Sequence, residues 1–66
     1  MPITLNGKIE YFDCPISIFE LLNKKGLKPQ RVVVEVNYEI IDRKNWGDFL
    51  LNENDQVEIL QFVGGG

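Results

Sequence analysis

The first eleven residues alternate between apolar and polar positions on both sides of an Asn-Gly pair. A period of two is typical of a half-buried strand, and it is present over residues 3–5 and again over residues 9–11. Asn6 and Gly7 between them favour a tight type I′ turn, because both residue types tolerate positive φ. The pattern therefore predicts an opening β-hairpin, and we expect four side chains to share its inner face: Ile3, Leu5, Ile9 and Tyr11.

The next stretch has the period of a helix. Ser17 and Glu20 have the spacing of a capping box, in which each side chain accepts a hydrogen bond from the backbone N–H of the other residue. Gly26 is suited to the position just after a helix, where a left-handed backbone is common. The pattern predicts a helix over residues 17–25, with one apolar face made by Ile18, Leu21 and Leu22.

A β-branched run follows over residues 31–37 and predicts a strand. Val32, Val34 and Val36 alternate along it, which places them on one face. A turn at Asn37-Tyr38 then leads into a short return strand over residues 39–41.

The segment after this strand has no regular period. Asp42 is expected to cap a short helical turn through residues 43–46, and the polar residues 52–55 predict a turn. The last strand is predicted over residues 56–62, with apolar side chains on both faces. Three residues of the irregular segment are expected in the core: Trp46, Phe49 and Leu50.

The order of these elements predicts an α+β fold with a mixed sheet of four to five strands and one main helix across one face. A right-handed crossover places the first strand beside the last strand, in parallel, which is the β-grasp (ubiquitin-like) arrangement. The last strand is then central in the sheet. We expect a single β-grasp domain over residues 1–62, followed by a flexible glycine tail over residues 63–66.

Composition narrows the possible functions. The net charge is −3, which disfavours a general nucleic-acid binder because such proteins need a basic surface. There is no histidine and a single cysteine, Cys14, so neither a zinc site nor an internal disulfide is expected. Cys14 has no basic neighbour in the sequence that would activate it, and a structural thiol is the favoured interpretation over a persulfide site. No apolar run or leader indicates a membrane protein or a secreted one, so a soluble intracellular protein is expected.

The chain closes on Gly64, Gly65 and Gly66, which bring no side-chain chemistry. Such an end offers a thin peptide and an unhindered carboxylate, although an ordinary frayed terminus has the same composition. Leu60, Phe62 and Val33 could form an exposed apolar docking patch beside it, and the alternative is that the segment 42–52 covers them.

Several stretches, taken together, resemble a known family. They are Leu5-Asn6-Gly7, the helix segment 17–22, the run Val34-Glu35-Val36-Asn37-Tyr38-Glu39-Ile40-Ile41 with Arg43 and Trp46, and the end from Asp55 to Gly66. On these residues the chain resembles the ThiS family, the ubiquitin-like sulfur-carrier proteins of thiamine biosynthesis. Gly64 is a departure, because many relatives have another small or apolar residue there.

The resemblance implies a protein cosubstrate without catalytic activity of its own. The carboxylate of Gly66 would be adenylated and converted to a thiocarboxylate that donates sulfur to the thiazole ring, while Gly65 threads the channel of the partner enzyme. The partner surface would include Val63 and Gly64 beside the patch.

The resemblance also implies the partners: a ThiF-like adenylating enzyme that uses Mg-ATP, a ThiG-like thiazole synthase and a cysteine desulfurase relay. The chain itself would bind no cofactor, metal, nucleic acid or membrane, and would be a monomer when free, in the bacterial cytoplasm or the plastid stroma. The alternatives are a sulfur carrier for another pathway such as molybdopterin synthesis, a ubiquitin-like protein modifier, and an interaction module with no chemistry at its end.

Overall fold

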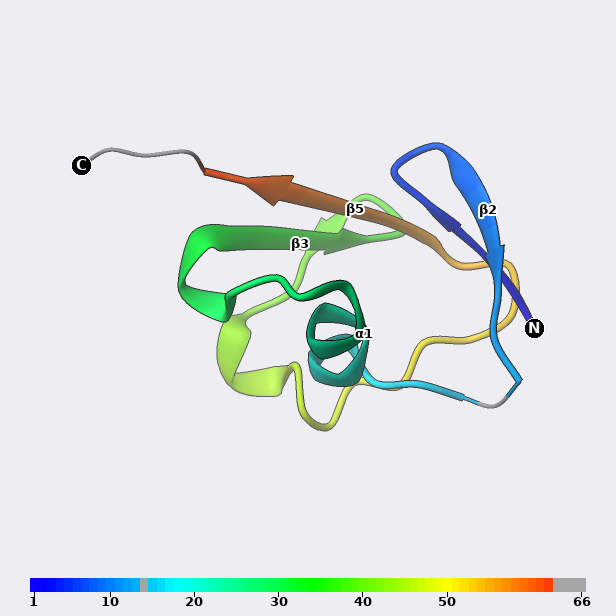
Figure 1. Cartoon of the computed structure of the whole chain (residues 1–66), viewed down its shortest axis with the longest axis horizontal. Coiled ribbons are helices and arrows are strands. Elements are labelled where there is room, and N and C mark those ends of the chain that lie inside the picture. The colour runs from blue at the N-terminus through cyan, green and yellow to red at the C-terminus, as the bar shows by residue number, and fades with distance from the viewer. Residues whose placement is uncertain (14, 63–66) are drawn as a thin grey trace.

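In the part of the chain that the structure describes, a mixed five-stranded sheet and one α-helix make up the fold (Figure 1). The computed structural model describes residues 1–13 and 15–62. The strands are β1 (Pro2–Leu5), β2 (Lys8–Tyr11), β3 (Val32–Val36), β4 (Glu39–Ile40) and β5 (Gln56–Gln61). The helix is α1 (Ile18–Lys25), and two short 3-10 turns, η1 (Pro29–Arg31) and η2 (Arg43–Asn45), complete the elements.

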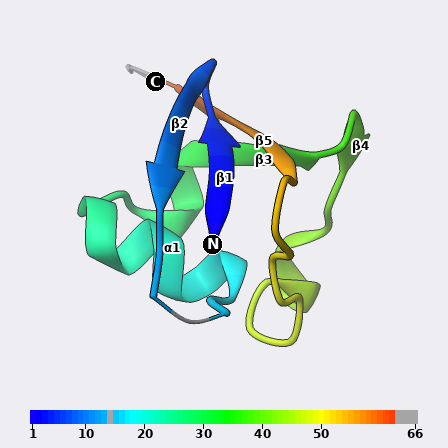
Figure 2. The ribbon, with the colours of Figure 1, turned by 90° about the vertical axis from the view of Figure 1, so that its right-hand side faces the viewer.

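The sheet has the order β2-β1-β5-β3-β4, so β5 is its central strand. β1 and β5 are parallel, and the other neighbouring pairs are antiparallel. Figure 2 shows the β1–β2 hairpin beside β5, with α1 beneath the sheet. These observations confirm the predicted β-grasp arrangement, including the parallel pairing of the first and last strands.

The helix begins and ends where the sequence predicts. The backbone N–H of Glu20 donates to Oγ of Ser17 at 3.1 Å, and the N–H of Ser17 donates to Oε1 of Glu20 at 2.9 Å, so both bonds of the capping box are present. Gly26 follows the helix with φ of 70°, a left-handed conformation that glycine adopts without a steric penalty. The local signals alone therefore define both ends of α1.

The core lies between α1 and one face of the sheet. That face presents the alternate residues of β3 and β5, as the valine pattern predicts, and α1 packs its apolar side against them. The buried residues on these three elements are Val32, Val34, Val36, Val57, Ile59, Ile18, Leu21 and Leu22.

The predicted inner face of the hairpin is wrong for two of its four residues. The side chains of Ile9 and Tyr11 are 62% and 75% exposed, whereas Ile3 and Leu5 are buried. The two-residue turn pairs Leu5 with Lys8, and residues directly opposite each other share a face of the sheet. Lys8 and Glu10 therefore lie on the face of Leu5 and Ile3, and Ile9 and Tyr11 lie on the other face.

Two expectations for the irregular segment are also corrected. The 3-10 turn η2 forms after Asp42, but the side chain of Asp42 makes no capping hydrogen bond. Trp46 is buried and Phe49 packs against the core, as expected, but Leu50 is 56% exposed and Leu51 is buried in its place. Leu50 forms an isolated antiparallel bridge with Ser17, and neighbouring side chains of an extended chain point in opposite directions.

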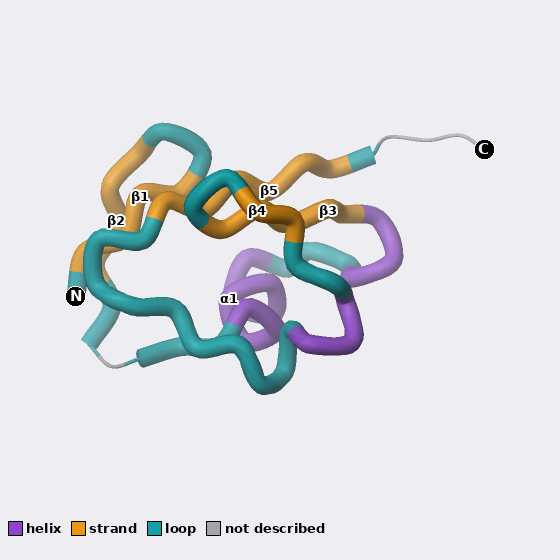
Figure 3. The backbone as a smooth tube through the Cα atoms, turned by 180° about the vertical axis from the view of Figure 1, so that it is seen from behind, coloured by secondary structure: helices purple, strands orange, loops and turns teal. Residues whose placement is uncertain are grey.

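Figure 3 shows α1, η1 and η2 on one side of the sheet. We call the opposite side the outer face, and define it by the strand residues that alternate with the buried ones. No described helix is long and apolar enough to span a membrane.

Candidate functional site

The end of β5 is where the sequence predicts the functional site, and the structure places this strand in the middle of the sheet. Val57 and Ile59 point into the core, and Gln56, Glu58 and Leu60 are exposed on the outer face. β5 is hydrogen-bonded to β1 on one side and to β3 on the other. The strand that leads to the chain end is therefore held from both sides.

An exposed apolar patch flanks the end of this strand. Val33 on β3 lies directly opposite Leu60, which puts both side chains on the outer face. Leu60 and Phe62 are 55% and 60% exposed, and Val33 is partly buried. The loop that carries η2 lies on the other side of the sheet (Figure 3), so the alternative in which segment 42–52 covers these residues is wrong. We call Val33, Leu60 and Phe62 the apolar patch.

Five residues of interest lie outside the part of the chain that the structure describes. They are Val63, Gly64, Gly65 and Gly66, to which the reactive end and part of the partner surface were assigned, and Cys14. The described chain ends at Phe62, whose backbone N–H donates to the carbonyl of Arg31 at 2.8 Å. The backbone four residues before Gly66 is thus tied to η1, which precedes β3.

Asn6 is a positioning residue that sequence reasoning missed. Its Nδ2 donates to the carbonyl oxygen of Ile59 at 3.3 Å, and the N–H of Ile59 donates to its Oδ1 at 2.7 Å. The backbone N–H of Asn6 also donates to the carbonyl of Val57 at 2.9 Å. The side-chain amide thus extends the pairing between β1 and β5 beyond the point at which β1 turns away.

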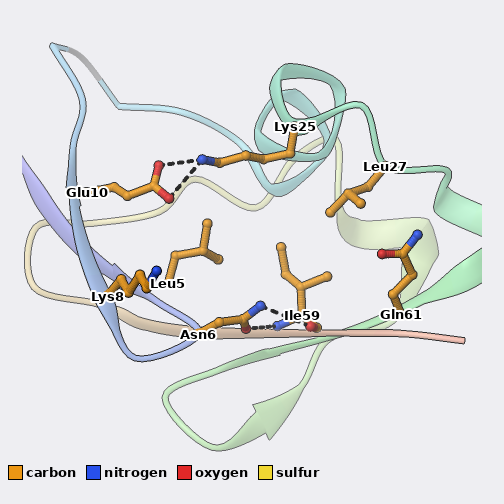
Figure 4. Close-up of a pocket in the computed structure, with 8 residues that line it drawn as sticks. All are labelled: Leu5, Asn6, Lys8, Glu10, Lys25, Leu27, Ile59 and Gln61. Atoms are coloured by element: carbon orange, nitrogen blue, oxygen red, sulfur yellow. Dashed lines mark hydrogen bonds and ion pairs between the residues drawn. The ribbon is translucent and has the colours of Figure 1, made fainter.

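A groove of about 440 Å³ lies beside β5 on the helix side of the sheet (Figure 4). Leu5, Leu27 and Ile59 line its apolar part. At its rim, Nζ of Lys25 lies 2.6 and 2.8 Å from the two carboxylate oxygens of Glu10, which joins α1 to β2. The lining residues include no cysteine, histidine or hydroxyl side chain, and the amine of Lys25 is paired with the carboxylate of Glu10.

Residues 1–13 and 15–62 contain no candidate metal site. No three or more side chains of the types His, Cys, Asp and Glu are grouped there in a way that could hold a metal ion. Every buried side-chain nitrogen and oxygen of the described chain has a hydrogen-bond partner. The arrangement that remains is a braced central strand with an apolar patch beside its end.

The fold belongs to the ubiquitin-like β-grasp class. Comparisons with known proteins find relatives that share this fold. The crystal structure of the thiamine biosynthesis protein ThiS from Geobacter metallireducens superimposes with a TM-score of 0.85 at 33% identity, over the whole of both chains. The sulfur carrier protein ThiS of Bacillus subtilis is 37% identical over 65 residues, which are 97% of this chain and 98% of the relative. The model of the ThiS family matches residues 3–66.

The chain belongs to the ThiS family, the sulfur carriers of thiamine biosynthesis. It also matches the thiazole synthases of Magnetococcus marinus and Paramagnetospirillum magneticum, at 36% and 32% identity over all 66 residues. The chain spans a fifth of the length of these two relatives, since the match covers 20% of each.

Proposed function

We propose that this chain carries sulfur as a thiocarboxylate on Gly66 and delivers it to the forming thiazole ring. The observation that carries the proposal is the family match, which runs from residue 3 through residue 66 and so includes the three terminal glycines. The position of β5 supports it, because a central strand gives a fixed starting point for a peptide that must enter another protein.

The chemistry needs activation of the Gly66 carboxylate, because a carboxylate is a poor electrophile. One carboxylate oxygen attacks the α-phosphorus of ATP, pyrophosphate leaves, and the resulting acyl adenylate has AMP as its leaving group. The terminal sulfur of a protein persulfide from a cysteine desulfurase relay then displaces AMP at the carbonyl carbon. A thiol cleaves the S–S bond of the resulting acyl disulfide, which gives the thiocarboxylate and a disulfide. A glycine carbonyl has no substituted α-carbon beside it, so it is the least hindered carbonyl for a sulfur nucleophile.

A ThiF-like adenylating enzyme would bind Mg-ATP and catalyse the reaction, and this chain would be its substrate. The match to the two thiazole synthases supports a ThiG-like enzyme as the acceptor of the sulfur. In those relatives a segment that resembles this whole chain is one fifth of the same polypeptide. A covalent link of this kind would keep donor and acceptor at high effective concentration.

The apolar patch is proposed to dock the carrier on its partners while Gly65 and Gly66 reach the active site. Exposed apolar side chains grouped on a small domain mark partner surfaces more often than isolated ones do. Leu60 and Phe62 are on or just after the strand that leads to the glycines, so docking there aims the end of the chain. Val63 and Gly64 would complete this contact.

Adenylation can be tested by ATP–pyrophosphate exchange with the ThiF-like enzyme. The wild-type chain should stimulate exchange, and the chain without Gly66 should not, while both unfold at the same denaturant concentration. Equal stimulation by the shortened chain would contradict the assignment of the reactive carboxylate to Gly66.

A further inference from the structure

A hollow of about 260 Å³ opens between the two tight turns at the start of β5. It lies at the other end of β5 from the apolar patch, and it is lined by Asn6, Gly7, Tyr38, Gln56 and Glu58. Two of these residues, Gln56 and Glu58, belong to the exposed row of β5 that also includes Leu60. The hollow and the apolar patch are therefore parts of one outer face.

Tyr38 forms one wall of the hollow in a conformation that is unfavourable for it. Its φ is 71°, in the left-handed region that glycine and asparagine adopt much more readily. The side chain is 81% exposed, yet its hydroxyl donates to Oε1 of Gln56 at 2.8 Å. The two-residue turn between β3 and β4 requires positive φ at both Asn37 and Tyr38, and it holds this exposed aromatic ring beside the hollow.

The opposite wall is negatively charged. Glu58 lies directly opposite Glu35 on β3, and like charges at such a position destabilise a sheet. Neither carboxylate forms an ion pair or a side-chain hydrogen bond with any residue that the structure describes. Lys8 is the one cation on the described strands, and it lies opposite Leu5 on the helix-facing side. The outer face of the strands is therefore acidic and apolar, with no basic residue of its own.

We propose that the hollow receives an arginine side chain of the adenylating enzyme, with Glu58 as its counter-ion and Tyr38 as the aromatic wall. A guanidinium can bond a carboxylate with two parallel N–H groups while its flat face stacks on a ring, and an ammonium group has no flat face to stack. A cation there also relieves the repulsion between Glu58 and Glu35. This inference rests on the proposed function, and it adds a polar contact to the apolar one.

The spacing along β5 fits a single partner surface. Glu58 and Leu60 are two residues apart on the same face, which is about 7 Å at the rise of a strand. One protein can therefore cover the apolar patch and place a basic side chain in the hollow at the same time. The charged contact would raise the association rate and the specificity of binding, while the apolar patch would provide the apolar surface that is buried in the complex.

The test is calorimetric binding of the ThiF-like enzyme to three variants of the full chain. Glu58→Gln should weaken binding about tenfold and make its salt dependence shallower. Tyr38→Asn keeps a residue that tolerates positive φ and should weaken binding about threefold. Glu53→Gln removes the same charge from an exposed turn outside the hollow and should bind as the wild type does. The unfolding midpoints of Glu58→Gln and Tyr38→Asn should be no lower than that of the wild type.

The outcomes separate this inference from the proposed function. If the wild type is adenylated and Glu58→Gln binds as tightly as Glu53→Gln, the hollow is not a contact site and only the inference fails. If Glu58→Gln alters self-association in sedimentation while enzyme binding is unchanged, the occupant is a second copy of this chain, which also overturns it. If the wild type neither binds the enzyme nor is adenylated, the proposed function fails, and the inference fails with it.

Discussion

The side-chain amide of Asn6 forms two hydrogen bonds with the backbone of Ile59, 53 residues further along the chain. Asn6 is a turn residue with φ of 49°, and it serves as one more pairing position for β5 after β1 has ended. One asparagine thus provides both the positive φ that the turn needs and the hydrogen bonds that extend the sheet. This contact fixes the middle of the strand that leads to the chain end.

Asn6→Gly should destabilise the protein by about 1–3 kcal/mol, because glycine keeps the positive φ but leaves the backbone groups of Ile59 without these partners. Chemical denaturation measures the loss, and the amide of Ile59 should exchange faster with solvent. Asn54→Gly is the matched control: Asn54 also has positive φ, at 70°, and its side chain makes no hydrogen bond with the described residues. A loss of stability as large in the control would show that the Asn6 side chain is not the cause.

Leu51→Ala should cost about 2–5 kcal/mol, since Leu51 is fully buried and its truncation leaves a cavity. The same substitution at the exposed neighbour Leu50 should change the free energy of unfolding by less than about 1 kcal/mol. Thermal unfolding of the two variants compares them directly. An equal loss of stability in the two variants would contradict the packing of Leu50 and Leu51 that the structure shows.

Ser17→Ala should lower stability by about 0.5–2 kcal/mol, because the N–H of Glu20 loses the oxygen that caps the helix. Asp42→Ala provides the comparison. Asp42 precedes η2 at the same kind of position but makes no capping bond, so its loss should stay within about 0.5 kcal/mol. Urea denaturation of both variants checks the difference, and a larger effect at Asp42 would contradict it.

Phe62→Asp should leave the fold intact and weaken binding to the adenylating enzyme by at least about tenfold, since it puts a charge into a desolvated contact. Tyr11→Asp is the matched control, because Tyr11 is an exposed aromatic residue of the outer face on the edge strand β2. Calorimetry with the enzyme should find the Tyr11 variant close to the wild type. Unchanged affinity for Phe62→Asp would remove the apolar patch from the docking surface.

Local patterns predicted most of the fold. The Asn-Gly turn, the Ser17–Glu20 capping box and the alternating valines of β3 each depend on residues a few positions apart, and each is present in the structure. The order of elements then leaves few topologies for so short a chain, and the parallel pairing of β1 with β5 follows from a right-handed crossover. The resemblance to the ThiS family over these stretches is confirmed by the family match.

The predicted side-chain faces were wrong where a shift of one residue along the chain reverses the direction of the side chains. In the hairpin, a two-residue turn pairs Leu5 with Lys8, and counting the faces without this register reverses every side chain of β2. Leu50 and Leu51 are both leucines in a segment without a period, and which one is buried depends on how this segment pairs with residues 16 and 17. Asn6 could be predicted as a turn residue, but its contact with Ile59 depends on tertiary structure.

Intact mass spectrometry distinguishes a thiocarboxylate on Gly66 from an unmodified chain end. The chain is incubated with the adenylating enzyme, Mg-ATP, a desulfurase with its sulfur source, and a thiol reductant. We expect the wild type to gain the mass difference between one sulfur and one oxygen, and the chain without Gly66 to keep its mass. An unchanged wild-type mass, or a ladder of conjugates joined to lysine residues, would contradict this expectation.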